Sequence, residues 1–279
     1  MEVESFDDAA EFRSVADSLL LADEAVNNLI LGVTSTVIHD PDTFEGFGAW
    51  VAREAGVPVA AAARTPPHNL ILALTTSEPA VHALANQIPH LPGVVGVSPS
   101  VHRFAEARPE TATLTMSQGV FQLSEVVPPP PVEGLSRQAR SEEVDQLVEW
   151  RLAFEEEAIG HVDDPSLSRR STEWRIEEQS SRFGLWVHEV NGEVVCISGH
   201  SGPTPNGIRI GPVYTPPEHR GRGYASTLVA SESQWLLDQG HSYCFLYTDL
   251  ANTTSNSIYT RLGYSQIAES AEYTFNPSV

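Results

Sequence analysis

The sequence predicts an α/β (α+β) fold built from two similar halves, and three features carry this prediction. In the C-terminal half, apolar strand-like runs alternate with segments of helical periodicity. The N-terminal half repeats this succession more weakly. Four consecutive prolines at 128–131 favour a stiff, extended spacer between the halves. A chain of 279 residues also suits two domains of about 100–150 residues each. We therefore expect domains at 1–127 and 134–279, joined by a proline-rich linker at 128–133.

The C-terminal half is expected to begin with two helices and a β-hairpin. Ser141 can cap the first helix, whose apolar residues recur at helical spacing. The second helix spans 165–182, and Asn191-Gly192 predicts a tight turn between strands at 184–190 and 193–199. The elements expected after the hairpin are a strand at 207–214, a glycine-rich loop, a helix at 225–237, a strand at 243–247, a helix at 254–261, and short strands near 264–268 and 273–275.

The N-terminal half is expected to follow a similar order. Its predicted elements are helices at 14–31, 78–88 and 99–107, strands at 47–53, 57–64, 69–74 and 94–97, and a closing hairpin of 111–116 and 120–127. A single unrelated α/β domain is the alternative interpretation of this half.

The segment Arg220-Gly221-Arg222-Gly223-Tyr224-Ala225 lies between a predicted strand and a predicted helix. Backbone N–H groups at a helix start bind phosphate, and glycine lets an anion approach the backbone closely. A dinucleotide fingerprint would place a third glycine where Ser226 stands, and a P-loop requires a lysine, which this chain lacks. The loop therefore predicts a ligand that carries a pyrophosphate.

Two motifs in this half resemble a known family. The pattern R-x-x-G-x-A, formed by Arg220, Gly223 and Ala225, resembles motif A of the GNAT (GCN5-related) N-acetyltransferases. Downstream, Asn252, Asn256, Tyr259 and the segment 262–264 (Leu-Gly-Tyr) resemble the end of motif B. The resemblance covers about residues 134–279. It implies a mixed, mostly antiparallel central sheet flanked by helices, with acetyl-CoA as co-substrate.

The N-terminal half looks like a degenerate copy of the same domain. Where the glycine loop should follow the predicted strand at 69–74, the chain reads Thr75-Thr76-Ser77-Glu78-Pro79. This segment has no glycine and places a carboxylate at the helix start. We therefore expect that the N-terminal half does not bind CoA and instead helps to form the acceptor site; two independent domains on a stiff linker are the alternative.

The resemblance also implies roles for individual residues. Proline cannot donate to a strand ladder, so the sheet must open or bulge at Gly211-Pro212, where the family binds pantetheine. Tyr259 is the expected general acid that protonates the leaving thiolate, with packing as the simpler interpretation. The residues expected to bind the cofactor are Val213, Thr215, Arg220, Gly221, Arg222, Gly223, Tyr224, Ala225, Asn252 and Asn256.

Several side chains are candidates for the general base. Asp249 follows a predicted strand, and Glu155, Glu156 and Glu157 lie on the first helix of the C-terminal half. His200 is a further candidate, although a surface-loop position is the simpler interpretation of this residue. A chain of water molecules is the alternative to any single base.

Composition narrows the class of protein further. A net charge of −21 argues against nucleic acid as a partner, because phosphates require a basic face. The chain has no apolar run near the 20 residues of a membrane span, no signal-peptide pattern and no metal-binding motif. Cys196 and Cys244 lie in strand-like runs and are expected to be buried thiols in a cytoplasmic protein.

These observations predict an acetyl-CoA-dependent N-acetyltransferase that acts on a small-molecule amine. A tandem enzyme similar to mycothiol synthase is one special case of this class. The alternative is a non-catalytic CoA-binding or scaffolding protein built from GNAT-like domains.

Overall fold

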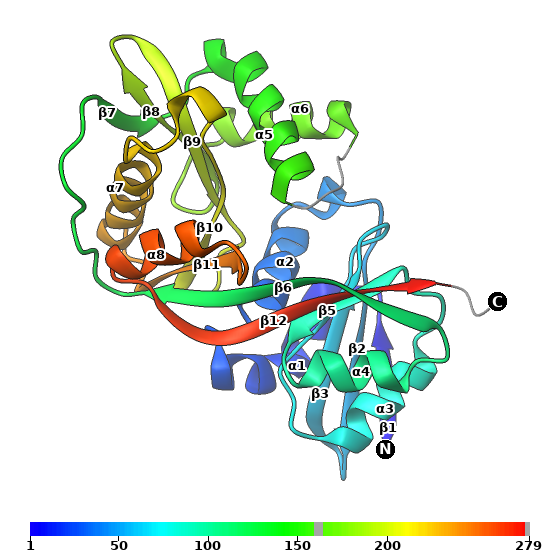
Figure 1. The fold of residues 1–279 in the computed structure, drawn as a ribbon. Helices are drawn as coiled ribbons and strands as arrows, with labels where there is room; N and C mark the ends of the chain where they lie inside the picture. Colours follow the sequence, from blue (N-terminus) through cyan, green and yellow to red (C-terminus); the bar gives the residue numbers. More distant parts are fainter. Residues whose placement is uncertain (159–163, 277–279) are drawn as a thin grey trace.

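The computed structural model describes residues 1–158 and 164–276, and the same succession of elements occurs twice along them (Figure 1). Each half runs strand, two helices, three strands, helix, strand, helix, strand. The N-terminal elements are β1 (Glu2–Phe6), α1 (Ala9–Leu20), α2 (Asn28–His39), β2 (Gly48–Glu54), β3 (Val57–Arg64), β4 (Leu70–Leu72), α3 (Glu78–Gln87), β5 (Gly93–Val97), α4 (Ser100–Ala107) and β6 (Thr111–Leu123). The C-terminal elements are β7 (Leu135–Gln138), α5 (Val144–Ala158), α6 (Pro165–Glu177), β8 (Gly184–Val190), β9 (Glu193–Ser201), β10 (Gly207–Tyr214), α7 (Tyr224–Asp238), β11 (Tyr243–Asp249), α8 (Thr253–Arg261) and β12 (Ser265–Asn276).

The predicted fold class is confirmed, but several predicted elements are wrong. The helix expected at 14–31 is two helices, α1 and α2, and strands β1 and β7 were not expected. The closing hairpin at 111–127 is one continuous strand, β6, and the two last short strands form the single strand β12. Gly119 is not a turn residue: a Cβ there would lie 2.6 Å from the Phe121 ring, so this glycine permits close packing within β6.

All twelve strands join in one mixed sheet, in the order β1-β2-β3-β4-β5-β12-β6-β11-β10-β9-β8-β7. Two neighbouring pairs are parallel, β4 with β5 and β10 with β11, and the other pairs are antiparallel. Each parallel pair is connected through one helix, α3 or α7, as parallel strands require.

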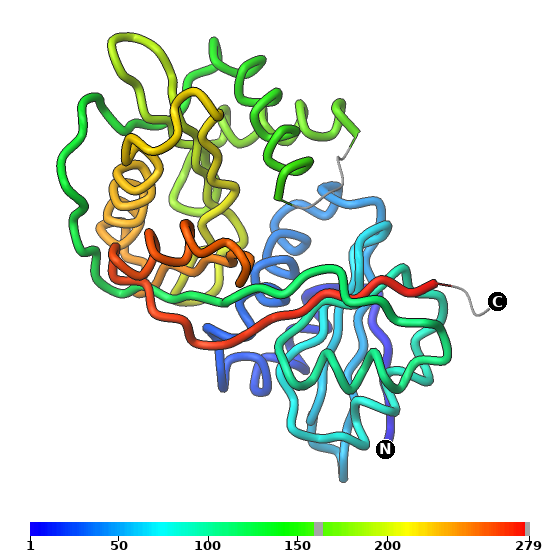
Figure 2. The backbone as a smooth tube through the Cα atoms, viewed as in Figure 1, coloured from blue at the N-terminus to red at the C-terminus, as the bar shows by residue number. Residues whose placement is uncertain are grey.

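The two halves exchange their last strands. Strand β6 belongs to the N-terminal half in sequence, yet it pairs with β11 from Cys244↔Leu123 to Asp249↔Gln118. Strand β12, from the C-terminal half, pairs with β5 and also runs beside β6. Figure 2 shows β6 in green and β12 in red running together from one half to the other. The alternative of two independent domains on a stiff linker is therefore wrong, although 128–133 form neither helix nor strand.

Helices cover both faces of the sheet in each half. In the C-terminal half, α7 packs across β8–β11, while α5 packs on β10 and α6 on β8. Helix α2 of the N-terminal half also packs on β10, and a Cβ at Gly32 would lie 2.6 Å from the carbonyl oxygen of Gly202, directly after β9. This close approach places the N-terminal half directly against the C-terminal sheet. No helix among residues 1–158 and 164–276 has the length and apolarity needed to cross a membrane.

Candidate active site

The parallel strands β10 and β11 separate soon after they meet. They pair from Gly207↔Tyr243 to Arg209↔Phe245, and the described register ends there although both strands continue. On the other side of β10, the register with β9 shifts between Ile210 and Val213. Gly211 and Pro212 lie within this shift, because proline has no N–H for the ladder. The predicted opening of the sheet is thus present, and it leaves β10 backbone groups facing the gap.

The glycine-rich loop has the backbone conformation that an anion cradle requires. Gly221 has a φ of +77° and Gly223 a φ of +84°, a left-handed region that favours glycine. Helix α7 begins at Tyr224, and no side chain caps its N-terminus at Gly223. The N–H groups of the first turn, including those of Tyr224 and Ala225, therefore have no partner within the helix. The loop itself is exposed at residues 220–223.

The two arginines of the loop have different environments. Arg220 donates from Nε to the carbonyl oxygen of Thr215 at 2.8 Å and from Nη2 to Glu157 Oε2 at 2.7 Å. Arg222 donates to the carbonyl oxygen of Glu218 at 3.1 Å and is exposed. A phosphate at the loop would have to compete with Glu157 for Arg220, whereas Arg222 is held by one backbone contact.

Val213 and Thr215 border the gap through their backbones. The side chain of Val213 packs against the apolar core beneath α7 and α8. The Thr215 hydroxyl donates to Cys196 Sγ at 3.1 Å. Neither side chain therefore reaches toward a ligand, so any contact with pantetheine would use main-chain atoms.

The two asparagines stabilise α8. Asn252 is its N-cap, and its Oδ1 accepts from the backbone N–H of Ser255 at 3.0 Å. Asn256 donates from Nδ2 to the carbonyl oxygens of Asp249 and Leu250, both at 3.2 Å. The buried Oδ1 of Asn256 has no partner in the described part of the chain. Asn256 thus ties α8 to the end of β11, and its Oδ1 can still accept from a ligand.

Tyr259 lies on α8 next to Cys196. Its side chain is 8% exposed and packs edge-on against Tyr264, with ring centroids 6.0 Å apart. Burial raises the pKa of the Tyr259 phenol, and Cys196 raises it further. Burial likewise raises the pKa of the Cys196 thiol, to about 12. The phenol is therefore fully protonated at neutral pH, as a general acid must be. The position of Cys196 near this site was not expected, because the alternation of side chains along a strand does not reveal which residues of other elements pack against it.

The candidate general bases are held by different partners in different parts of the structure. His200 is fully buried, not in a surface loop: Nδ1 contacts Glu232 Oε1 and Nε2 donates to the carbonyl oxygen of Ser180, each at 2.8 Å. Glu157 is held by Arg220 and accepts from the Tyr214 hydroxyl at 3.1 Å. Asp249 accepts from the backbone N–H of Ala251 at 2.8 Å. Glu155 and Glu156 lie beside Glu157 near the end of α5.

The corresponding place in the N-terminal half contains no comparable loop. Helix α3 is capped by Ser77, whose hydroxyl accepts from the N–H of Ala80, and Pro79 lies in its first turn without an N–H. The N–H of Thr75 donates to Ser100 Oγ at 3.0 Å. At this helix start the N–H of Ala80 is thus paired with the chain itself, and position 79 offers no N–H.

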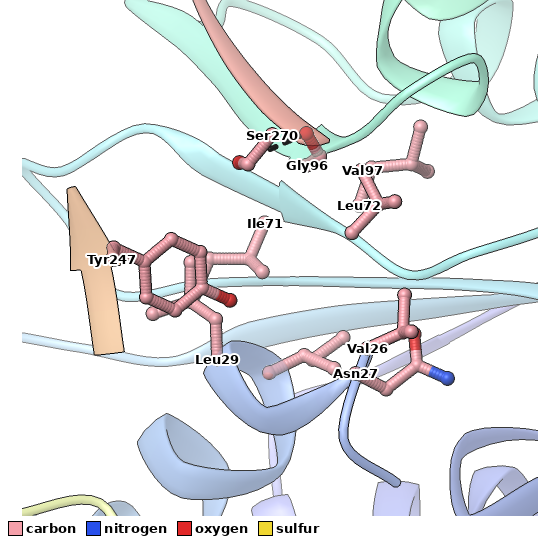
Figure 3. A pocket seen from close by; sticks show the side chains of 10 residues that line it. Val26, Asn27, Leu29, Ile71, Leu72, Gly96, Val97, Tyr247 and Ser270 are labelled. Atoms are coloured by element: carbon pink, nitrogen blue, oxygen red, sulfur yellow. Dashed lines mark hydrogen bonds between the residues drawn. The ribbon is translucent and has the colours of Figure 1, made fainter. Parts of the chain in front are cut away.

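The N-terminal half contacts the C-terminal sheet beside the gap. Asn28 Nδ2 donates to the Tyr247 hydroxyl at 3.2 Å, and Glu24 accepts from the Asn206 backbone N–H at 2.8 Å. Figure 3 shows the small cavity where these parts meet, with Tyr247 of β11 opposite Val26 and Leu29. Its volume of about 10 Å³ is at most that of one water molecule, so it is not a substrate pocket. Among the described residues, no group of three or more His, Cys, Asp or Glu side chains could hold a metal ion.

Comparisons with known proteins agree with this architecture. The family model described as FR47-like protein matches residues 204–273, which include the loop and α8. An acetyltransferase of the GNAT family from Colwellia psychrerythraea is 13% identical, covers 99% of this chain and 100% of its own, and has a TM-score of 0.61. A GCN5-related N-acetyltransferase from Sphaerobacter thermophilus is 17% identical, with coverage of 99% and 97% and a TM-score of 0.60. A tandem GNAT protein from the clavulanic acid biosynthesis pathway is 15% identical over 100% of both chains, with a TM-score of 0.57. No curated protein matches the sequence.

Proposed function

We propose that this protein, which has the GNAT fold in a tandem arrangement, transfers an acetyl group from acetyl-CoA to the amine of a small molecule. The single observation that carries the proposal is the combination of an open β10–β11 pair with an uncapped, glycine-led start of α7. These two features lie at the same end of β10. Together they offer main-chain partners for the amides of a pantetheine arm and N–H donors for a pyrophosphate.

The residues of the gap suit the binding of such a cofactor. The β10 backbone from Gly211 to Tyr214 can pair with pantetheine amides as an added strand would. The first-turn N–H groups of α7 face the place of the pyrophosphate, and Arg222 can add charge. Because the start of α3 in the N-terminal half is capped by Ser77 and has no glycine-rich loop, we assign one acetyl-CoA site to the chain, in the C-terminal half.

The proposed chemistry is direct transfer. Acetyl-CoA supplies the acyl group as a thioester; the amine forms a C–N bond to the carbonyl carbon while the C–S bond breaks. The amine gives up one proton to water, the sulfur takes one from the Tyr259 phenol, and the phenolate regains a proton from water. Burial raises the pKa of the Tyr259 phenol, which therefore keeps its proton at neutral pH and can donate it to a thiolate formed beside it.

The N-terminal half is proposed to form one wall of the acceptor site. Helix α2 packs on β10, and Asn28 contacts Tyr247 on β11, so this half borders both separating strands. His39 at the end of α2 also stacks on Phe183, with ring centroids 5.6 Å apart. An acceptor that approaches from this side would meet both halves.

A screen of amines with acetyl-CoA tests the proposal. Release of free CoA thiol would be followed across a panel of amines, with the wild-type chain and the Tyr259→Phe variant. We expect turnover of at least one amine and a loss of that turnover in the variant. Binding of CoA without turnover of any amine, together with no effect of Tyr259→Phe, would instead favour the non-catalytic CoA-binding or scaffolding protein.

A further inference from the structure

Three arginines gather on the side of the sheet that α5, α6 and α2 cover. Arg175 on α6 donates from Nη2 to Ser201 Oγ at 3.2 Å, at the end of β9. Arg209 comes from β10, where it pairs with Ser201 in the strand register, and a Cβ at Gly202 would lie 3.1 Å from its Nη2. Arg151 on α5 donates to Thr172 Oγ1 at 2.7 Å. The cluster thus lies where β9 turns into β10.

Two of these guanidinium groups each have one nitrogen without an acceptor. Arg175 Nη1 and Arg209 Nη1 are buried and have no hydrogen-bond partner among residues 1–158 and 164–276. Neither arginine takes part in a salt bridge within those residues. The carboxylate of Glu232 attracts Arg175 electrostatically, but it is hydrogen-bonded to His200 at 2.8 Å. In the described part of the chain no carboxylate therefore forms an ion pair with Arg175 or Arg209, although the net charge of the chain is −21.

Such an arrangement is costly unless an anion completes it. Buried cations are normally paired, and a buried N–H without an acceptor loses the hydrogen bonds that water would give. Burial lowers the pKa of Arg175 to about 9, and the charges of Arg151 and Arg209 act in the same direction. At neutral pH the group still carries its charge. Within residues 1–158 and 164–276 no acceptor meets Arg175 Nη1 or Arg209 Nη1, which leaves these two donors for a ligand.

The position of the cluster excludes the acetyl donor as that ligand. Arg209 lies five residues before Tyr214, about 17 Å along the strand from the end that leads into the glycine loop. It lies only two residues, about 7 Å, from Gly211, where β10 opens. The cluster also adjoins the N-terminal half, because Arg209 interacts with Tyr247, which accepts from Asn28. An anion held here would belong to a molecule entering from the acceptor side.

We propose that Arg175 and Arg209 bind a carboxylate of the acceptor, so that the substrate is an amine that also carries a carboxyl group, as an amino acid does. The assignment rests on the proposed acetyl transfer. Guanidinium groups match the planar carboxylate with paired hydrogen bonds. A carboxylate offers two acceptor oxygens for the two unpartnered Nη1 atoms, and a phosphate is the competing anion.

Matched pairs of acceptors test this assignment. Amino acids, their decarboxylated amines, and 2-aminoethylphosphonate would be compared as acceptors with the full-length chain and with Arg175→Gln and Arg209→Gln. Arg170→Gln is the control, because Arg170 lies on the same helix but is exposed. We expect the wild type to prefer an amino acid, and each cluster variant to lower its kcat/KM about 10- to 100-fold, mainly through KM. Turnover of the decarboxylated amine and the Kd for acetyl-CoA should not change.

The outcomes separate this inference from the proposed function. Equal use of amino acids and decarboxylated amines, preference for the phosphonate, or weaker acetyl-CoA binding in the cluster variants would overturn it. If no amine is turned over, the proposed acetyl transfer fails. The anion site is then tested on its own, by measuring thermal unfolding at increasing concentrations of sodium acetate. Saturable stabilisation of the wild type that both cluster variants lose would support the site; the same stabilisation in all variants would overturn it.

Discussion

Removal of strand β6 from the C-terminal half should prevent that half from folding. A fragment of residues 134–279 contains the predicted catalytic domain but lacks β6, which separates β11 from β12 in the sheet. Val120, Phe121 and Leu123 of β6 are 0%, 4% and 1% exposed. Burial of such side chains contributes about 1.5–3 kcal/mol each, or about 5–9 kcal/mol together. Because a whole domain is stable by only about 5–15 kcal/mol, this loss is comparable with its entire stability.

A longer fragment provides the matched control. Residues 111–279 retain β6 between β11 and β12 and lose the contacts that residues 1–110 make with the C-terminal half, such as those of β5, α2 and Glu24. Urea unfolding followed by circular dichroism would report folding, and calorimetry would report acetyl-CoA binding. We expect 111–279 to unfold cooperatively and bind acetyl-CoA, and 134–279 to do neither. The reasoning is refuted if 134–279 unfolds cooperatively and binds acetyl-CoA like the full chain, or if both fragments are equally unfolded.

Three further predictions concern the cofactor site. Tyr259→Phe should lower kcat by roughly 10²–10⁴ with little change in acetyl-CoA affinity, as steady-state kinetics would show. Because the pKa of Tyr259 is raised, its proton is lost only above the ordinary tyrosine range, so kcat should not fall between pH 8 and 10; a tyrosine-dependent fall there would contradict the assignment. Gly223→Val should weaken acetyl-CoA binding at least about tenfold, because valine disfavours a positive φ, whereas Gly56→Val in the distant hairpin, with a φ of +81°, should leave the Kd unchanged; equal effects would reject a role for the loop. Glu157→Gln should tighten acetyl-CoA binding up to about fivefold by releasing Arg220 from an exposed ion pair, and weaker binding in a titration would show that Arg220 does not reach the phosphates.

The structure changes the reason for the effect expected at Gly223. Because glycine lets an anion approach the backbone closely, the sequence alone predicts that a valine side chain at 223 would block the phosphate. A Cβ at this position instead lies 3.0 Å from Val132, in the segment that connects the halves. The substitution would thus act through backbone strain and this contact.

The local features of the site were predictable because short-range physics determines them. Glycines at 221 and 223 adopt positive φ, and Gly211-Pro212 interrupts the strand, since both effects depend on the residue itself. The absence of a glycine-rich anion loop after β4 could also be predicted, because Ser77 and Pro79 determine the start of α3 locally. The roles of individual residues in binding and catalysis stay predictions.

The tertiary structure alone decided which strands lie side by side and which polar groups are buried. Periodicity identified strand-like runs near 111–127 and 264–275, but each was divided into two strands, and nothing local indicated that β6 and β12 change places. His200 and Arg209 show the same limit. Arg209 was expected in a strand and His200 in a surface loop, but Glu232 beside His200 and the lack of a described acceptor for Arg209 Nη1 depend on distant helices. A strand's pattern of side chains specifies which face is buried, whereas its partner is chosen by contacts between residues far apart in the chain.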